Sequence, residues 1–191
     1  MQIILASSSP YRKQLLAKLG LEFNCESPSI DEYPLPNESA KQMAERLSIQ
    51  KAQAVANNHN NAVIIGSDQA AAFGSHIIGK PGNRENAIKQ LRQFSGQRLT
   101  FYTGLCVINS DTLQQRSLVE SIEVTFRQLS ANQIVNYLDA EQPYDCAGSF
   151  KSEGLGISLF TAINGRDPNT LIGLPLIALC DLLPEFNIQV I

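Results

Sequence analysis

The strongest constraint on the fold is a continuous apolar run in the first half of the chain, residues 62–66. A short run of this kind predicts a buried strand. The run is followed by the polar residues Ser67, Asp68 and Gln69, and we expect the strand to end there. Residues 3–6 form a similar short run near the N-terminus and predict a second buried strand.

Helix-start signals alternate with these strand-like runs. Ser9 followed by Pro10 is typical of a helix N-terminus, and Asn83 can cap another. Residues 39–42 and 130–133 are capping-box patterns. Further expected elements are strands at residues 99–109, 118–126 and 157–163, a turn at 74–75 and a last helix within 175–183. With no repeat or linker, this mixture predicts one α/β domain over residues 1–191, with a long twisted mixed sheet and flanking helices.

Composition argues against several classes of protein. A net charge of -3 provides no broad basic surface, so long nucleic acid is a poor candidate ligand. No apolar stretch approaches the roughly 20 residues of a membrane span, and the N-terminus lacks the pattern of a signal peptide. We therefore expect a cytoplasmic protein that binds no membrane. Scattered cysteines and the absence of GxSxG disfavour a zinc centre and a Ser-His-Asp hydrolase.

Polar residues after the first strand form a candidate anion site. A helix that begins near Pro10 would present unpaired N–H groups and the positive end of its dipole. Ser7 can donate to phosphate oxygens, and Arg12 can bind them through two N–H groups. Taken alone, these residues favour the alternative, a Ser-Pro helix cap followed by a solvated basic first turn, because such caps are common.

Asp68 is a candidate catalytic carboxylate, because α/β proteins place ligands beside the carboxyl ends of strands. It could hold a metal ion or activate water, and the acidic loop residues Asp31 and Glu32 could supply a second carboxylate. An aspartate that helps to form a turn is the alternative. Lys80 within Gly79-Lys80-Pro81, together with Lys51, could offset the charge of a polyphosphate. A β-turn and a solvated helix face are the alternatives for these lysines.

Taken together and in order, these motifs are more specific, and they resemble the Maf family over nearly the full chain. The matching segments are residues 6–10, 31–32, 50–52, 66–68, 79–81, 101–104, 147–149 and 173–176. The resemblance implies a nucleoside triphosphate pyrophosphatase. It also implies a fold similar to that of the inosine triphosphate pyrophosphatases, with two lobes around a cleft.

Three segments resemble the branch of the family that hydrolyses 7-methyl-GTP: residues 66–69, 146–154 and 165–170. The dTTP/UTP branch usually has Arg at the position of Tyr11, Thr at Gln69 and Gln at Glu153. The 7-methyl-GTP branch commonly has Trp where Tyr11 stands. Tyr11, Gln69 and Glu153 are therefore the expected specificity residues, with Glu153 pairing to the guanine edge and Tyr11 stacking on the ring.

The resemblance also implies how the reaction proceeds. Water attacks the α-phosphate with Asp68 as proton acceptor, while Ser7, Arg12, Lys51 and Lys80 bind the phosphates. A divalent cation such as Mg²⁺ or Mn²⁺ is expected near Asp68 and Glu32. The expected partner is a small nucleotide, and a homodimer is an open alternative to a monomer. A dTTP/UTP pyrophosphatase and a nucleotide-binding regulator of septum formation remain competing functions.

Overall fold

The computed structural model describes residues 1–191 and contains one seven-stranded mixed sheet with the order β2-β1-β3-β5-β6-β7, in which β4 pairs with β3. The strands are β1 (Gln2–Ala6), β2 (Asn24–Glu26), β3 (Ala62–Phe73), β4 (His76–Ile78), β5 (Arg98–Asn109), β6 (Gln115–Phe126) and β7 (Phe160–Gly165). The helices are α1 (Pro10–Ala17), α2 (Ala40–Ala56), α3 (Arg84–Phe94), α4 (Ala131–Glu141), α5 (Asn169–Ile172) and α6 (Leu176–Leu182). Three 3₁₀ turns are η1 (Ala147–Ser149), η2 (Leu155–Leu159) and η3 (Leu183–Phe186). The predicted α/β class with a long mixed sheet is confirmed.

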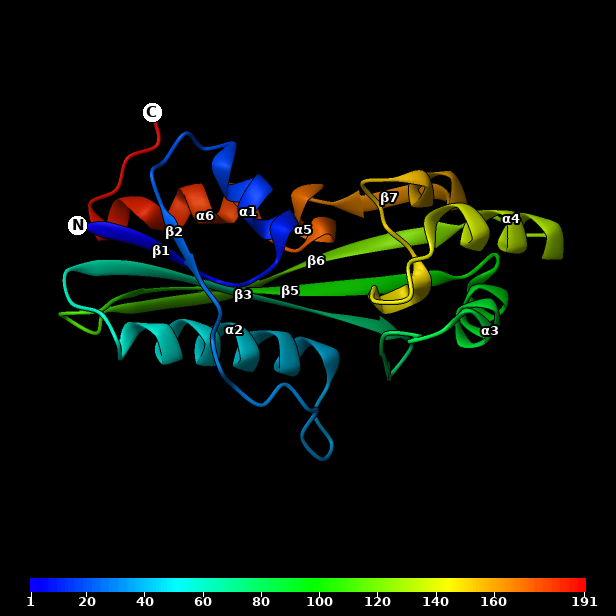
Figure 1. Ribbon diagram of the computed structural model, residues 1–191, viewed down its shortest axis with the longest axis horizontal. Coiled ribbons are helices and arrows are strands. Elements are labelled where there is room, and N and C mark those ends of the chain that lie inside the picture. Colours follow the sequence, from blue (N-terminus) through cyan, green and yellow to red (C-terminus); the bar gives the residue numbers. More distant parts are fainter.

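The helices divide into two groups along the length of the sheet (Figure 1). At one end, α2 covers one face while α1 and α6 cover the other; α3 and α4 lie at the opposite end. Separate cores underlie the two groups: a cluster of 16 buried residues includes side chains of α3 and α4, and clusters of 14 and 9 include those of α1, α6 and α2. The two-lobed arrangement is therefore present. None of these helices is long and apolar enough to cross a membrane.

The helix starts confirm the sequence signals at the N-termini. Ser39 and Ser130 each form a complete capping box, and Ser9 and Asn83 cap α1 and α3 through their side chains. The sequence predicts these helix starts because the two residues that form each cap lie within a few positions of each other.

The prediction that the central strand ends at Ser67-Asp68-Gln69 is wrong, because β3 continues to Phe73. The antiparallel partner β5 pairs with β3 through this triplet, and Ser67 donates to the carbonyl oxygens of Gly104 and Gly173 at 2.8 and 2.9 Å. The parallel neighbour β1 does end here, since Ala6 pairs with Gly66. Asp68 therefore lies within a strand, but just beyond the parallel part of the sheet.

The expected strand at residues 157–163 is also displaced, because β7 begins at Phe160. The preceding residues form the turn η2. Glu141 accepts from the backbone N–H of Leu155 at 2.7 Å, and the Ser158 hydroxyl donates to the Leu155 carbonyl at 2.7 Å. These local bonds satisfy backbone groups that a strand would have paired across the sheet.

Glycines allow α2 to lie directly against the sheet. A Cβ atom at Gly104 would lie 2.1 Å from the carbonyl oxygen of Ala44, and one at Gly66 would lie 2.3 Å from that of Ser48. This close approach brings the α2 side chains onto the middle of β3, where Asp68 lies.

We expect Gly104→Ala to lower the free energy of unfolding by about 1–3 kcal/mol or more, since backbone atoms cannot yield to the added methyl group. Urea unfolding of the purified variant measures this loss. Gly79→Ala is the matched control, because a Cβ there would meet nothing within 4 Å. Equal midpoints for the two variants would contradict the packing argument.

Candidate active site

A cleft of about 810 Å³ opens between the two lobes. It is lined by the start of α1, the loop between β2 and α2, α2 itself, β3, the end of β4 and the loop before η2. Nine of the residues expected at the site line it: Ser7, Tyr11, Arg12, Glu32, Lys51, Asp68, Gln69, Lys80 and Glu153. Asp31, the other candidate for the second carboxylate, does not line the cleft and instead accepts from the Tyr33 N–H at 2.9 Å. The structure thus brings together residues from both halves of the sequence, while their individual roles stay predictions.

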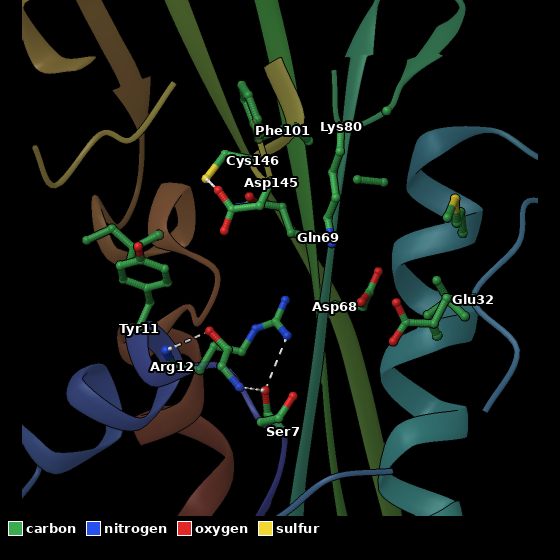
Figure 2. Close-up of a pocket in the computed structure, with 18 of the residues that line it drawn as sticks. Ser7, Tyr11, Arg12, Glu32, Asp68, Gln69, Lys80, Phe101, Asp145 and Cys146 are labelled. Atoms are coloured by element: carbon green, nitrogen blue, oxygen red, sulfur yellow. Dashed lines mark hydrogen bonds between the residues drawn. The ribbon is translucent and has the colours of Figure 1, made fainter. Parts of the chain in front are cut away.

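An ion-paired triad forms the floor of the cleft. The Lys51 ammonium lies 2.6 Å from Asp68 Oδ1 and 2.7 Å from Glu32 Oε1. Lys51 is only 5% exposed and Asp68 only 7%, so the solvated helix face that was one alternative for Lys51 is wrong. A buried charge needs a partner of opposite charge, and Lys51 and Asp68 neutralise each other. Figure 2 shows the Asp68 and Glu32 carboxylates turned toward each other.

Positive charge surrounds Glu32, whose pKa lies below its usual value. Burial opposes ionisation of this carboxyl, but the hydrogen bond and charge of Lys51 outweigh that effect, with further contributions from Lys80 and Arg12. Lys80 follows β4 and extends its side chain toward the same space (Figure 2). Two carboxylates, Asp68 and Glu32, thus share the cleft with three cations, Lys51, Lys80 and Arg12.

Ser7 and Arg12 form the wall of the cleft facing Asp68 (Figure 2). The Ser7 hydroxyl oxygen accepts from Ser9 N–H at 3.1 Å and from Arg12 Nη1 at 3.5 Å. Arg12 Nε donates to the Gly173 carbonyl at 2.8 Å, which orients the guanidinium. Burial lowers the pKa of Arg12, while the charges of Asp68 and Glu32 oppose that change. A fixed guanidinium beside a helix N-terminus suits a phosphate group.

The far end of the cleft carries Tyr11 and Glu153. Burial raises the pKa of Tyr11, Lys151 opposes this rise, and the negative charge of Glu153 adds to it, so these groups lie near the phenol. Glu153 is exposed, and its carboxylate accepts one hydrogen bond, from the Ser152 hydroxyl at 3.3 Å. This end of the cleft therefore presents an aromatic ring and a carboxylate with few bonds inside the protein, a pair that can attract a cation.

Cys146 and Lys151 also line this end of the cleft, although the sequence assigned them no role. Both occur within the segment 146–154 that resembles the 7-methyl-GTP branch. That resemblance is the sequence feature that could have identified them as residues of the cleft. Burial, with the charge of Asp145, raises the pKa of Cys146 to about 12. The thiol therefore stays protonated at neutral pH and is not an activated nucleophile.

The Gln69 side chain is bound within the protein, although we expected it to contact a ligand. Its amide nitrogen lies 3.0 Å from Thr103 Oγ1, 2.8 Å from the Thr170 carbonyl and 3.1 Å from the Leu171 carbonyl. These contacts tie β3 to β5 and α5. All three of these contacts use the amide nitrogen and none uses the amide oxygen.

Asp68 and Glu32 fit a hard divalent cation. Carboxylate oxygens suit Mg²⁺ and Mn²⁺, and both side chains already converge on one ammonium group. No group of three or more histidine, cysteine, aspartate or glutamate side chains is placed so that it could hold a metal ion. A cation here would therefore complete its coordination with water and with substrate phosphates, as Mg²⁺ commonly does.

The family model described as Maf-like protein matches residues 2–186. The chain is 55% identical to the 7-methyl-GTP pyrophosphatase of Pseudoalteromonas atlantica, covering 100% of this chain and 97% of the relative. It is 55% identical to the protein of the same name from Colwellia psychrerythraea (99% and 94% covered) and 53% identical to that from Vibrio vulnificus (100% and 97%). Among solved structures, the Staphylococcus aureus Ham1 protein has a TM-score of 0.47 and 14% identity, covering 67% of this chain and 73% of that one.

Proposed function

This chain belongs to the Maf family, and from that membership we propose that its cleft hydrolyses 7-methyl-GTP to 7-methyl-GMP and diphosphate. The observation that carries the proposal is the Asp68–Lys51–Glu32 triad at the cleft floor, facing Arg12. Full-length relatives of that name at 53–55% identity support the choice of substrate. We treat residues 1–191 as one nucleotide pyrophosphatase domain, which the continuous sheet supports, and place it in the cytoplasm with a small-molecule partner.

The triphosphate would lie between the two walls of the cleft. Lys51 and Lys80 neutralise it from one side, while Arg12 and the Ser7 hydroxyl donate from the other. Catalysis of phosphoryl transfer is largely positioning and charge neutralisation, so a site built from fixed donors and cations suits it.

Asp68 is the residue that can accept a proton from the attacking water. Its Oδ1 atom is held by Lys51, whereas Oδ2 has no hydrogen-bond partner in the protein. The water oxygen attacks the α-phosphorus and loses a proton to Asp68. The bond from the α-phosphorus to the bridging oxygen breaks, and diphosphate leaves with that electron pair. Asp68 then returns its proton to solvent.

The methylated base would occupy the end of the cleft that carries Tyr11 and Glu153. Methylation at N7 places positive charge on the ring, which the Glu153 carboxylate attracts. The two carboxylate oxygens can accept from N1–H and from the exocyclic amine at once. Stacking of Tyr11 on a cationic ring contributes about 0.5–2 kcal/mol.

Asp68 and Glu32 would hold the divalent cation, which would offset phosphate charge as diphosphate leaves. We expect exhaustive chelation to reduce diphosphate release to background and added Mg²⁺ or Mn²⁺ to restore it. Chelator saturated beforehand with Mg²⁺ is the control. Full turnover of the metal-free protein would show that this reaction needs no such cation.

Hydrolysis in ¹⁸O-labelled water tests the proposed bond cleavage. Attack at the α-phosphorus puts the label into 7-methyl-GMP and leaves unlabelled diphosphate, which mass spectrometry distinguishes. Production of 7-methyl-GDP and orthophosphate would overturn the proposal. A nucleotide-binding regulator would instead bind the nucleotide and leave it intact.

A further inference from the structure

The loop between β2 and α2, residues 27–39, carries Glu32 but contains no helix or strand. Hydrophobic packing does not hold its middle: Tyr33 is 81% exposed and Leu35 is 53% exposed. The Glu32 side chain is itself 56% exposed. Contacts with α2, which this loop approaches in Figure 1, must therefore fix the position of Glu32.

Arg46 on α2 provides those contacts. Its Nε and Nη2 atoms donate to the two carboxylate oxygens of Glu38 at 2.6 and 2.7 Å, a bidentate pair. Nη2 also donates to the Tyr33 carbonyl at 3.1 Å, and Nη1 donates to Gln50 at 3.0 Å. The Glu38 and Arg46 side chains are only 7% and 19% exposed. Bidentate pairs of this kind are stronger and more directional than single contacts.

The loop is thus attached to α2 at Glu32 itself and at the residues that follow it. Lys51 holds the Glu32 side chain, and Arg46 holds the carbonyl of the next residue, Tyr33. Glu38 extends the attachment, because its Oε2 atom also accepts from the Leu35 N–H at 2.9 Å. Since α2 also presents Lys51 to Asp68, the same helix sets the separation between the two carboxylates.

We propose that Arg46 is a positioning residue that holds Glu32 beside Lys51 and Asp68 through Glu38 and the Tyr33 carbonyl, and thereby sets the affinity of the cleft for a divalent cation. The proposal rests on the proposed function in that Asp68 and Glu32 are taken to hold the cation. Without Arg46, the loop must be ordered when the cation binds, and that ordering weakens binding.

The test uses Mn²⁺ alone, with the free ion counted by electron paramagnetic resonance. Arg46→Ala is expected to bind Mn²⁺ about 10–100-fold more weakly than the wild-type protein, the usual effect of removing a partner that orients a metal ligand. Arg46→Lys should be intermediate, because an ammonium cannot form the bidentate pair. Arg116→Ala is the matched control: Arg116 pairs with Glu185 at 2.7 Å and does not line the cleft.

A double variant separates positioning from general structural damage. If Arg46 acts through Glu32, Arg46→Ala combined with Glu32→Gln binds Mn²⁺ as weakly as Glu32→Gln alone. Additive losses, an unaltered affinity in Arg46→Ala, or an unaltered affinity in Glu32→Gln would each overturn the proposal. Hydrogen exchange at the Tyr33 and Leu35 amides should rise in Arg46→Ala, because the loop loses its attachment.

Glu38→Gln provides a second route if Arg46→Ala does not fold. It keeps the shape of the side chain and removes the charge that Arg46 binds, so it should weaken Mn²⁺ binding in the same direction. Wild-type affinity in this variant would count against the proposal. None of these measurements needs a nucleotide, so failure to hydrolyse 7-methyl-GTP would defeat the proposed function without deciding the role of Arg46.

Discussion

Replacement of Asp68 by asparagine is expected to lower kcat by roughly 10²–10⁴-fold, the usual cost of losing a general base. Asparagine keeps the size of the side chain. Its amide oxygen can still accept the buried hydrogen bond that Lys51 donates to Asp68 Oδ1 at 2.6 Å. What is lost is the negative charge and the ability to take a proton. Steady-state diphosphate release measures kcat. The assay uses a saturating cation concentration, so that weaker cation binding by the variant does not contribute to the fall in kcat.

The KM for the nucleotide should not rise in Asp68→Asn, because removal of a negative charge leaves the cleft more attractive to a polyphosphate. Asp139→Asn is the control, since Asp139 pairs with Arg84 on the surface and does not line the cleft. Purified Asp68→Asn with near wild-type turnover would show that another group accepts the proton.

The second large effect concerns the base. Glu153→Gln is expected to reduce the ratio of kcat/KM for 7-methyl-GTP to kcat/KM for UTP by about 10–100-fold. Glutamine keeps one acceptor but loses the second acceptor and the charge, and a hydrogen bond to a charged group contributes about 1.5–3 kcal/mol. Stability should hardly change, because Glu153 is exposed and its carboxylate is bonded only to Ser152.

Substitutions at Tyr11 provide the matched comparison. Tyr11→Trp should preserve the preference, since a larger aromatic face binds a cationic ring at least as well. Tyr11→Arg should reduce it, because two positive charges would meet. Equal losses on 7-methyl-GTP and UTP in Glu153→Gln would mean that this carboxylate acts on a part of the substrate that both nucleotides share.

Local signals predicted much of the fold. The capping boxes at Ser39 and Ser130 and the caps at Ser9 and Asn83 lie where expected. Such signals depend on residues that are close in sequence, so a single chain is enough to read them. The gathering of the candidate site residues around one cleft was implied by the resemblance to the Maf family and not by any single motif.

Contacts between residues far apart in the sequence determine the features that local patterns did not predict. Polar residues at 67–69 look like the end of a strand, but β5 continues the pairing and α2 approaches closely at Gly66 and Gly104. Burial of Lys51 depends on that approach. The Arg46–Glu38 pair links a helix to a loop residue outside it, so no helical spacing reveals it.

The most direct test of the proposed function is kcat/KM of the wild-type protein for 7-methyl-GTP, GTP, dTTP and UTP, from diphosphate release under one set of conditions. We predict that 7-methyl-GTP exceeds each of the others by about 10-fold or more, since 1.4 kcal/mol of selective binding suffices for that ratio. Equal values for 7-methyl-GTP and UTP would contradict the assigned substrate, and no diphosphate from any of the four would contradict the pyrophosphatase itself.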